Sequence, residues 1–391
     1  MRTLSKIKIF ISVLLLGICS SSLAYSFDTK ARAAYVIDQT SGTILLSKNT
    51  DLPLPPASMS KLMTLYMTFE FIKAGRLSLD EKLPVSVNAA NYTGSTMFLD
   101  PTDRVAVIDL IRGIIVLSGN DACAVLAEAL SPDGTEAGFA KLMTKRAKQL
   151  GLKNSTFKNS NGWPASGHQM SVRDLGLLAE KIIIDFPEYY PMFAEQIYEF
   201  DGRAPANIRN RNPLLGLGIG ADGLKTGHTE EAGYGLVGSA KQDGRRIIFV
   251  LSGLDSLEDR AQEAETIVNW AFRQFVMKKF GKSGFEIAKA KVWNGKSRTV
   301  GLHLARDLDV MIPVLSSSEP SFAVEYFGPI KAPINKGDRI AELVIKSQDL
   351  PETRHKLLAA NSVSAGGFFV QIRTAGEYLF SWLFTNPKES L

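Results

Sequence analysis

Three short motifs limit most strongly what this chain can fold into. In order along the chain they are Ser-Met-Ser-Lys at residues 58–61, Ser-Gly-Asn at residues 118–120 and Lys-Thr-Gly at residues 225–227. A serine hydroxyl becomes a strong nucleophile only when a neighbouring base takes its proton, and a lysine can be that base. Together the motifs contain the residue types that acyl transfer by a serine needs when a lysine replaces the usual histidine as base.

Each motif alone has little weight, because the chain contains accidental copies of the first one. Residues 5–8 and 155–158 also fit Ser-x-x-Lys. Ser58 differs from both copies because it follows two prolines and precedes a strongly apolar run at residues 62–72. Such a run after a proline start is typical of a buried helix. We expect Ser58 at the N-terminus of this helix and Lys61 one turn later on the same face.

Up to residue 279 the sequence predicts an α/β domain with an antiparallel sheet and a cluster of helices. Strands are expected at residues 34–38, 43–47, 223–227, 235–239 and 246–251. Helices are expected at residues 62–72, 107–117, 121–130, 138–150, 175–184 and 256–277. Because strands stand at both ends of this region, we expect its terminal parts to share one sheet.

After residue 279 the pattern changes to short alternating strands separated by polar turns. They are expected near residues 292–293, 300–302, 309–312, 322–326 and 342–345. This spacing predicts a small C-terminal all-β, sandwich-like domain at residues 280–366.

The last segment, residues 367–391, has the pattern of an amphipathic helix. Apolar side chains, such as Phe368 and Ile372, recur at a spacing of three to four residues. Arg373 and Glu377 argue against a helix that crosses a bilayer. We expect a helix that lies in the plane of a membrane surface and anchors the chain there; the alternative is a helix packed on its own domain.

The first 24 residues have the pattern of a secretory signal peptide. Three basic residues precede an apolar stretch at residues 9–18, and Ser22 and Ala24 supply the small residues of a cleavage site. The stretch is too short for a good transmembrane helix, and an uncleaved anchor is the alternative. We therefore expect residues 1–24 to be removed on export and residues 25–279 to form the catalytic domain.

Charge and composition exclude several other classes of protein. The net charge of +5 falls to +2 without the three basic residues of the signal peptide, and no long basic run remains, so we expect no nucleic-acid partner. The histidines His168, His228, His303 and His355 lack the spacing of metal ligands, and no phosphate loop or dinucleotide fingerprint occurs, so we expect no metal and no cofactor. Cys123 lies in an apolar run, which predicts a buried thiol without a disulfide.

The residue types in the three motifs suit acyl transfer by a serine. A lysine acts as a base only when its pKa falls towards neutrality, and burial together with the positive charge of Lys225 would lower the pKa of Lys61. Ser118 can relay a proton to the leaving amine, and Asn120 can hold a substrate amide. The backbone N–H groups of the nucleophile and of His228 can stabilise the oxyanion.

With their flanking residues, the three motifs resemble those of the low-molecular-mass penicillin-binding proteins, and among these the serine-type D-alanyl-D-alanine carboxypeptidases. The matching stretches are residues 56–64, 118–122, 159–162, 210–212 and 222–234. The resemblance covers essentially the whole chain. It implies a penicillin-binding/β-lactamase-like catalytic domain, then a β-rich domain and an amphipathic tail helix.

The resemblance implies a role for each catalytic residue. Ser58 is the expected acylated nucleophile and Lys61 its base. Ser118, Asn120 and Lys225 complete the expected site.

It also implies a binding strand for the substrate. Lys225, Thr226, Gly227 and His228 line this strand, and Thr226 together with Arg211 is expected to receive the terminal carboxylate. A surface arginine in a turn is the alternative for Arg211. The side chain of His228 can be idle even where its N–H is used.

The activity that the resemblance implies is removal of the terminal D-alanine from peptidoglycan stem pentapeptides. β-Lactam antibiotics are the expected covalent inhibitors, since they would acylate the same serine. The expected location is the periplasmic side of the cytoplasmic membrane, with peripheral anchoring through the C-terminal helix.

Three alternative functions remain open. A D,D-endopeptidase that acts on peptide cross-links would use the same residues. A class A-like β-lactamase would need a carboxylate in a Glu-x-x-Leu-Asn element before Lys-Thr-Gly, and the only similar spacing, residues 265–269, comes after it. A non-catalytic cell-wall binding protein would be expected to have lost one of the catalytic residues, and all are present.

Overall fold

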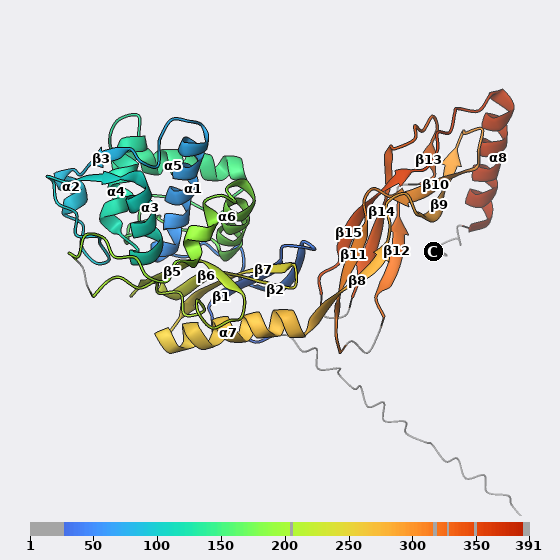
Figure 1. The fold of residues 1–391 in the computed structure, drawn as a ribbon. Coiled ribbons are helices and arrows are strands. Elements are labelled where there is room, and N and C mark those ends of the chain that lie inside the picture. Colours follow the sequence, from blue (N-terminus) through green and yellow to red (C-terminus); the bar gives the residue numbers. More distant parts are fainter. Residues whose placement is uncertain (1–26, 204–205, 316–318, 327, 348–349, 386–391) are drawn as a thin grey trace, which may run out of the picture.

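The computed structural model describes residues 27–203, 206–315, 319–326, 328–347 and 350–385, and the predicted signal peptide lies outside them. Figure 1 shows two parts that lie end to end. The first is an α/β domain, coloured blue to yellow, and the second is a β-rich domain, coloured orange to red.

A five-stranded antiparallel sheet forms the base of the α/β domain. Its strands, in spatial order, are β2 (Thr43–Lys48), β1 (Ala33–Asp38), β7 (Arg245–Leu254), β6 (Gly233–Gln242) and β5 (Ala221–Thr229). The N-terminal hairpin joins the later strands through β1, which pairs with β7. The prediction that both ends of the domain share one sheet is therefore confirmed, and β5, which carries the third motif, lies at an edge.

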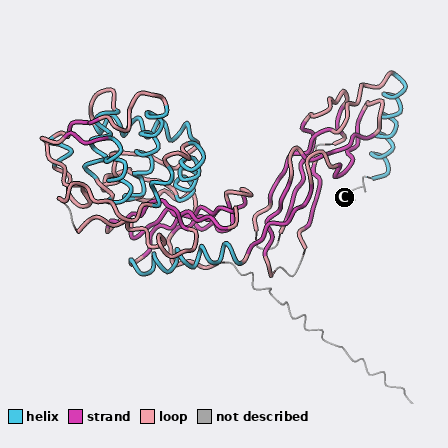
Figure 2. Tube along the Cα trace, viewed as in Figure 1, coloured by secondary structure: helices cyan, strands magenta, loops and turns pink. Residues whose placement is uncertain are grey.

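A cluster of helices covers one face of this sheet (Figures 1 and 2). Its main members are α1 (Lys61–Lys73), α3 (Val107–Arg112), α4 (Asn120–Leu130), α5 (Glu136–Leu150) and α6 (Val172–Asp185). Short 3-10 or π turns extend it at η1 (Ala57–Ser60), η2 (Gly113–Leu117) and η3 (Tyr190–Ala194). Around its rim lie α2 (Val87–Ala90) and the pair β3 (Lys82–Pro84) and β4 (Arg104–Ala106).

The central helix of the cluster is α1. All of its residues from Lys61 to Phe69 are buried, which explains why the sequence there is apolar on every side. Burying a side chain such as Phe69 stabilises the fold by about 1.5–3 kcal/mol relative to leaving it in water. The nucleophile motif therefore starts a helix whose position is fixed from all directions.

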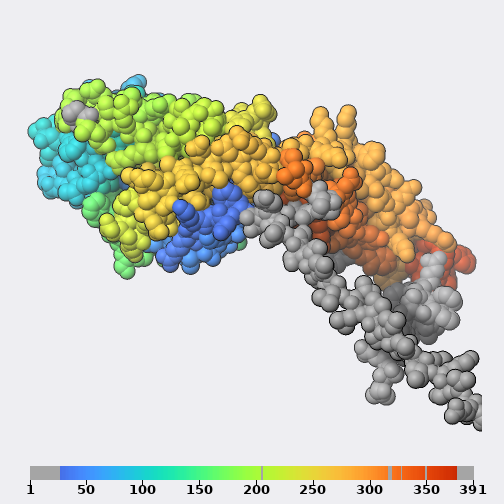
Figure 3. Space-filling view, turned by 90° about the horizontal axis from the view of Figure 1, so that it is seen from below, coloured from blue at the N-terminus to red at the C-terminus, as the bar shows by residue number. Residues whose placement is uncertain are grey.

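The opposite face of the sheet is covered by α7 (Leu257–Arg273), whose surface is visible in Figure 3. Alternate residues of β7 point to the two faces: Val250 packs among the helices of the cluster, whereas Phe249 and Leu251 pack with Ala264 of α7. The sheet thus separates two apolar cores, and the predicted α/β layering is confirmed.

The β-rich domain has its own core and two sheets. The six-stranded sheet runs in the order β12 (Ser321–Glu325), β14 (Arg339–Lys346), β15 (Thr353–Ala359), β10 (Thr299–Leu304), β9 (Glu286–Trp293) and β13 (Ile330–Lys331). The second sheet pairs β11 (Leu308–Pro313) with β8 (Phe275–Gly281). This confirms the predicted all-β second domain, although β15 was missed because its sequence begins with polar residues.

One predicted helix was too long. We expected a helix over residues 256–277, but α7 ends at Arg273 and the chain continues as β8 from Phe275. Phe275 is buried and pairs with Pro313 of β11. A distant strand therefore overrides the local helical pattern, which a sequence pattern cannot show. Because β8 spans residue 279, the domain boundary stays a prediction.

The tail forms the predicted helix, α8 (Phe368–Thr385). At its start Phe368, Phe369 and Ile372 are 71%, 86% and 53% exposed, so these apolar side chains are not packed on the β-rich domain. The helix lies at the end of the molecule away from the α/β domain (Figure 1). Within the described residues, no helix is long and apolar enough to cross a membrane.

Candidate active site

The nucleophile motif forms the turn η1, directly before α1. The Nζ of Lys61 lies 2.8 Å from the Oγ of Ser58, as expected for residues one helical turn apart. Gly162, with a φ of +83°, packs against this turn: a Cβ there would lie 1.9 Å from the carbonyl oxygen of Ala57. Only glycine fits this approach, so the loop around residue 162 holds the serine turn from outside.

Lys61 has no exposed surface and makes three hydrogen bonds. Besides Ser58, its Nζ donates to the Oδ1 of Asn120 at 2.8 Å and to the carbonyl oxygen of Asn161 at 2.6 Å. Burial, together with the nearby Arg211 cation, lowers the pKa of Lys61 to about 8. A buried lysine with this pKa can give up its proton near neutral pH and then accept one from Ser58.

The second motif lies at the junction of η2 and α4. Ser118 has a left-handed backbone (φ +63°), and its buried Oγ has no hydrogen-bond partner among the residues that the structure describes. Asn120 is fixed at both ends, because its Nδ2 donates to the carbonyl of Thr93 at 2.8 Å and its backbone N–H donates to the carbonyl of Ser95 at 2.7 Å. Ser118 thus keeps a free hydroxyl beside the rigid Asn120.

The third motif lies on the edge strand β5. Lys225 is 3% exposed, and its Nζ donates to the carbonyl oxygen of Thr226 at 3.1 Å. Burial, and then the nearby Lys61 cation, hold the pKa of Lys225 well below its usual value. Gly227 packs directly on the serine turn, since a Cβ there would lie 3.0 Å from the carbonyl oxygen of Pro56. The structure therefore brings all three motifs together.

The remaining two expected binding residues lie at the rim. His228 is exposed, and its ring stacks on Tyr234 with the centroids 3.8 Å apart. Arg211 reaches the second motif: it donates to the Oγ of Ser95 at 2.7 Å and to the carbonyl of Leu117 at 3.1 Å. Arg211 is nevertheless exposed, as a surface arginine would be, so its role in binding the substrate carboxylate stays a prediction.

Sequence reasoning missed Arg260 on α7. It is 5% exposed, its Nη2 donates to the carbonyl of Arg211 at 3.3 Å, and its Nε has no partner within the described chain. Burial lowers its pKa to about 10. One signal could have found it: Arg260 shares the apolar face of α7 with Ala264 and Ile267, where a charged residue needs an explanation.

Asn161 and Cys123 complete the surroundings of Lys61. The carbonyl of Asn161 was not assigned a role beforehand, because a backbone acceptor leaves no trace in the residue type. Cys123 is fully buried and free, which confirms the prediction of a buried thiol. Burial raises the pKa of this thiol to about 12, so it is no nucleophile near neutral pH.

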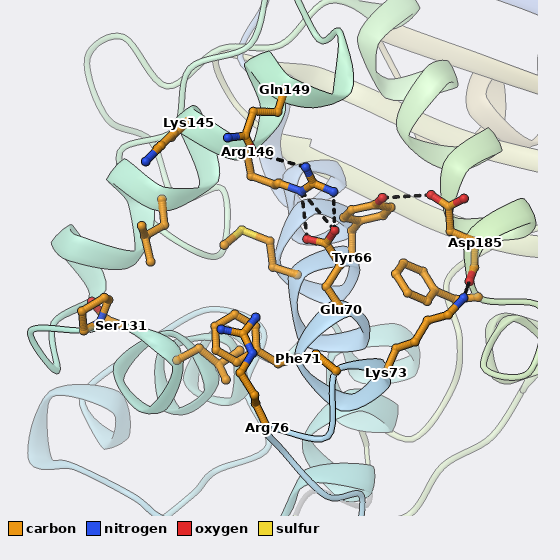
Figure 4. Close-up of a pocket in the computed structure, with 16 residues that line it drawn as sticks. Tyr66, Glu70, Phe71, Lys73, Arg76, Ser131, Lys145, Arg146, Gln149 and Asp185 are labelled. Carbon is orange, nitrogen blue, oxygen red and sulfur yellow. Dashed lines mark hydrogen bonds and ion pairs between the residues drawn. The ribbon is translucent and has the colours of Figure 1, made fainter.

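Cavity size alone would have pointed elsewhere. A cavity of about 1010 Å³ lies at the far end of α1 from Ser58 (Figure 4). There Arg146 pairs with Glu70 and the Tyr66 hydroxyl donates to Asp185, so these groups are committed to one another. A smaller cavity of about 480 Å³ borders Ala57 and Gly162, beside the serine turn.

Comparison with known proteins fits this chemistry. A family model described as D-alanyl-D-alanine carboxypeptidase matches residues 20–256, more than half of the chain. The chain belongs to this family. A second model, described as the C-terminal domain of penicillin-binding protein 5, matches residues 275–365.

Family members of several bacteria match over most of their length. The D-alanyl-D-alanine carboxypeptidase DacF of Bacillus subtilis is 31% identical over 95% of this chain and 99% of its own. DacC of Escherichia coli is 35% identical over 88% of this chain and 86% of its own. The crystal structure of penicillin-binding protein 5 from Haemophilus influenzae is 33% identical and has a TM-score of 0.73, covering 86% of this chain and 98% of that one.

Proposed function

We propose that the chain is a serine D,D-carboxypeptidase that removes the terminal D-alanine from peptidoglycan stem peptides through an acyl-enzyme on Ser58. The observation that carries this proposal is the buried Lys61, whose Nζ lies 2.8 Å from the Ser58 Oγ and whose pKa burial lowers to about 8. That pair supplies an activated nucleophile without a histidine.

Acylation begins when neutral Lys61 takes the Ser58 proton and the Oγ attacks the carbonyl carbon of the scissile peptide bond. The C–N bond then breaks as the proton on Lys61 passes through Ser118, whose Oγ is unpartnered in the described structure, to the departing D-alanine amine. In the second half Lys61 takes a proton from the water that attacks the ester and returns it to the Oγ of Ser58. Asn120 holds the substrate amide, and the N–H groups of Ser58 and His228 stabilise the oxyanion.

The terminal carboxylate of the substrate would meet a cluster of cations. Lys225, Arg211 and Arg260 make no ion pair with a carboxylate among the described residues. Lys225 and Arg260 are buried, and a buried cation without a counter-ion is costly, so a bound carboxylate would offset that cost. Thr226, which follows Lys225 on β5, offers a hydroxyl to the terminal carboxylate of the substrate.

β-Lactam antibiotics are proposed covalent inhibitors of this site. The penicillin-binding protein D2 of Listeria monocytogenes, 33% identical over 62% of this chain with a TM-score of 0.56, has been solved in an ampicillin-bound form. Opening of the lactam by Ser58 would give an ester at the same position as the natural acyl-enzyme. Release of that ester would be slow without a carboxylate that activates water.

Mass spectrometry tests the function directly. We expect the purified protein to release D-alanine from a diacyl tripeptide that ends in D-Ala-D-Ala, and to form a stable penicillin adduct on the peptide that contains Ser58. A Ser58→Ala variant should do neither, whereas a Ser60→Ala variant, which changes the adjacent buried serine, should keep the adduct. An adduct on Ser60, or none, would contradict the proposal.

The alternative functions give different results in the same assay. Fast turnover of penicillin would indicate a β-lactamase; the only sequence candidate for its carboxylate, Glu265, lies on α7, across the sheet from α1. A Ser58→Ala variant that keeps full cellular effect would indicate a binding protein. Cleavage of cross-linked dimers in preference to pentapeptides would indicate an endopeptidase, which uses the same site.

We also propose that the protein is exported to the periplasmic side of the cytoplasmic membrane after loss of residues 1–24. The basic start, apolar stretch and small residues before the cleavage point support export. Mature protein from the periplasm should begin at Tyr25. A mature chain that still begins at Met1 would contradict cleavage.

The exposed start of α8 supports attachment to a membrane surface. A double variant, Phe368→Ser with Phe369→Ser, should lower co-sedimentation with vesicles of anionic phospholipid roughly tenfold or more, because each phenylalanine contributes apolar surface to the lipid boundary. Phe285→Ser, which changes a phenylalanine that is 63% exposed on the same domain, is the control and should bind normally. Equal binding of all three proteins would show that α8 is no anchor.

A further inference from the structure

One carboxylate close to the site belongs to none of the three motifs. Glu136 opens α5 and is half-buried. Its Oε1 accepts hydrogen bonds from the backbone N–H of Ser160 at 2.9 Å and from the Ser160 hydroxyl at 2.5 Å. Its Oε2 accepts one from the Tyr92 hydroxyl at 2.5 Å. Both oxygens are therefore committed to residues of two different loops.

Each partner of Glu136 is the chain neighbour of an atom that holds the site. Ser160 precedes Asn161, whose carbonyl accepts the 2.6 Å hydrogen bond of the Lys61 ammonium. Tyr92 precedes Thr93, whose carbonyl holds the Nδ2 of Asn120. The two residues that bind Glu136 are therefore direct chain neighbours of two important carbonyl groups. One carbonyl accepts the hydrogen bond of Lys61, and the other accepts that of the Asn120 side chain.

The Ser160 loop is tied to the central helix as well. The backbone carbonyl of Ser160 accepts a hydrogen bond from the hydroxyl of Thr64 at 2.5 Å, and Gly162 on the same loop contacts the serine turn. Movement of this loop would therefore shift the acceptor of Lys61 and the backing of Ser58 together. A displacement of about 1 Å at a reacting group can cost on the order of 10²-fold in rate.

Glu136 is no base itself. Its two oxygens already accept three hydrogen bonds, and no hydrogen bond joins it to Ser58 or Lys61 in the described residues. It is consequently unlike the water-activating carboxylate of a β-lactamase. Its influence on the reaction can only pass through the two loops and through its negative charge.

We propose that Glu136 is a positioning residue for acyl transfer, which ties the loop of residues 159–163 to the loop of residues 91–96 and so fixes the acceptors of Lys61 and Asn120. The proposal rests on the function proposed above. It predicts that the hydrogen bonds of Glu136, more than its bulk, set the acylation rate.

The test is the rate of acylation by a fluorescent penicillin, measured against pH for the full chain. Glu136→Ala removes all three hydrogen bonds and should slow acylation about 10–100-fold. Glu136→Gln keeps an acceptor for Ser160 and a polar group for Tyr92, so its maximal rate should stay within about threefold of the wild type. Because the Glu136 charge raises the pKa of Lys61, the pH profile of the glutamine variant should shift to lower pH.

Glu128→Ala is the matched control. Glu128 is likewise half-buried and ties α4 to α2 by accepting a 2.9 Å hydrogen bond from Asn88, away from the three motifs. Loss of this hydrogen bond should lower the thermal stability of the protein, as the loss of a side-chain hydrogen bond usually does. The acylation rate and its pH profile should stay unchanged.

Three outcomes would overturn the proposal: Glu136→Ala acylates as fast as the wild type, Glu128→Ala slows equally, or Glu136→Gln is as slow as Glu136→Ala. If Glu136→Ala does not fold, Tyr92→Phe decides, since it removes only one tie and should slow acylation about threefold or more; an unchanged rate counts against the proposal. A wild-type protein that forms no adduct on Ser58 would overturn the proposed function as well, so the two failures are distinguishable.

Discussion

Replacing Lys61 with methionine is expected to slow penicillin acylation of Ser58 by about 10²–10⁴-fold, the usual contribution of a general base. Methionine has nearly the length of lysine and suits the apolar surroundings of α1, so the helix should form normally. The variant removes three hydrogen bonds at once, to Ser58, Asn120 and the carbonyl of Asn161. Stopped-flow or gel measurement with a fluorescent penicillin gives the rate.

The chain supplies its own control for this experiment. Lys158 belongs to an accidental Ser-x-x-Lys copy at residues 155–158 and is exposed. Its partner serine, Ser155, donates to Asp174 at 2.7 Å instead of contacting a lysine. Lys158→Met should therefore acylate like the wild type. A Lys61→Met protein that is folded by circular dichroism and still reacts at the wild-type rate would rule out Lys61 as the base.

Acidification of the unmodified protein should have an effect of similar size. Only the neutral amine of Lys61 can take the Ser58 proton, and its pKa lies at about 8. The acylation rate should thus level off above that pH and fall about tenfold for each pH unit below it, or roughly 10³-fold by pH 5. The measurement is the second-order rate constant with penicillin across this range.

Thermal melts at each pH are the control for this profile, because a folded protein at pH 5 shows that the loss is chemical. A flat profile between pH 8 and pH 5 would show that Lys61 is not the titrating base. An inflection near pH 10 would mean that burial does not lower the pKa of Lys61 in solution.

The parts of the site that the sequence predicted well are those encoded locally. Ser58 and Lys61 are three residues apart, and the apolar run after them is enough to predict the helix that brings them together. The union of the three motifs was predictable only from their resemblance to a known family. No local pattern brings Lys225 of an edge strand to Lys61 of a central helix.

The parts that were missed depend on contacts between distant segments. Glu136 binds Tyr92 and Ser160, which lie 44 and 24 residues away along the chain. Arg260 reaches the carbonyl of Arg211 from the other face of the sheet. Such partners depend on the tertiary fold, so residue type and spacing cannot identify them.

The same limit applies to the fold. The first three residues of β8, 275–277, were assigned to a helix because the strand partner β11 comes more than twenty residues later. The alternating strands of the second domain were predicted more reliably, because the period of two is visible within a few residues. Short-range periodicity therefore gave the class of each domain, while strand pairing decided where one element ends.

The pairing of β1 with β7 has a consequence for how the chain is made. Ala33 lies opposite Ser252, so the first strand to leave the ribosome waits for one of the last strands of the α/β domain before the sheet can close. Contacts across so long a stretch form late, because the entropy of closing the loop is lost before any contact compensates for it. The five-stranded sheet can therefore close only after β7 has been synthesised, and the α/β domain should gain its native stability late in synthesis.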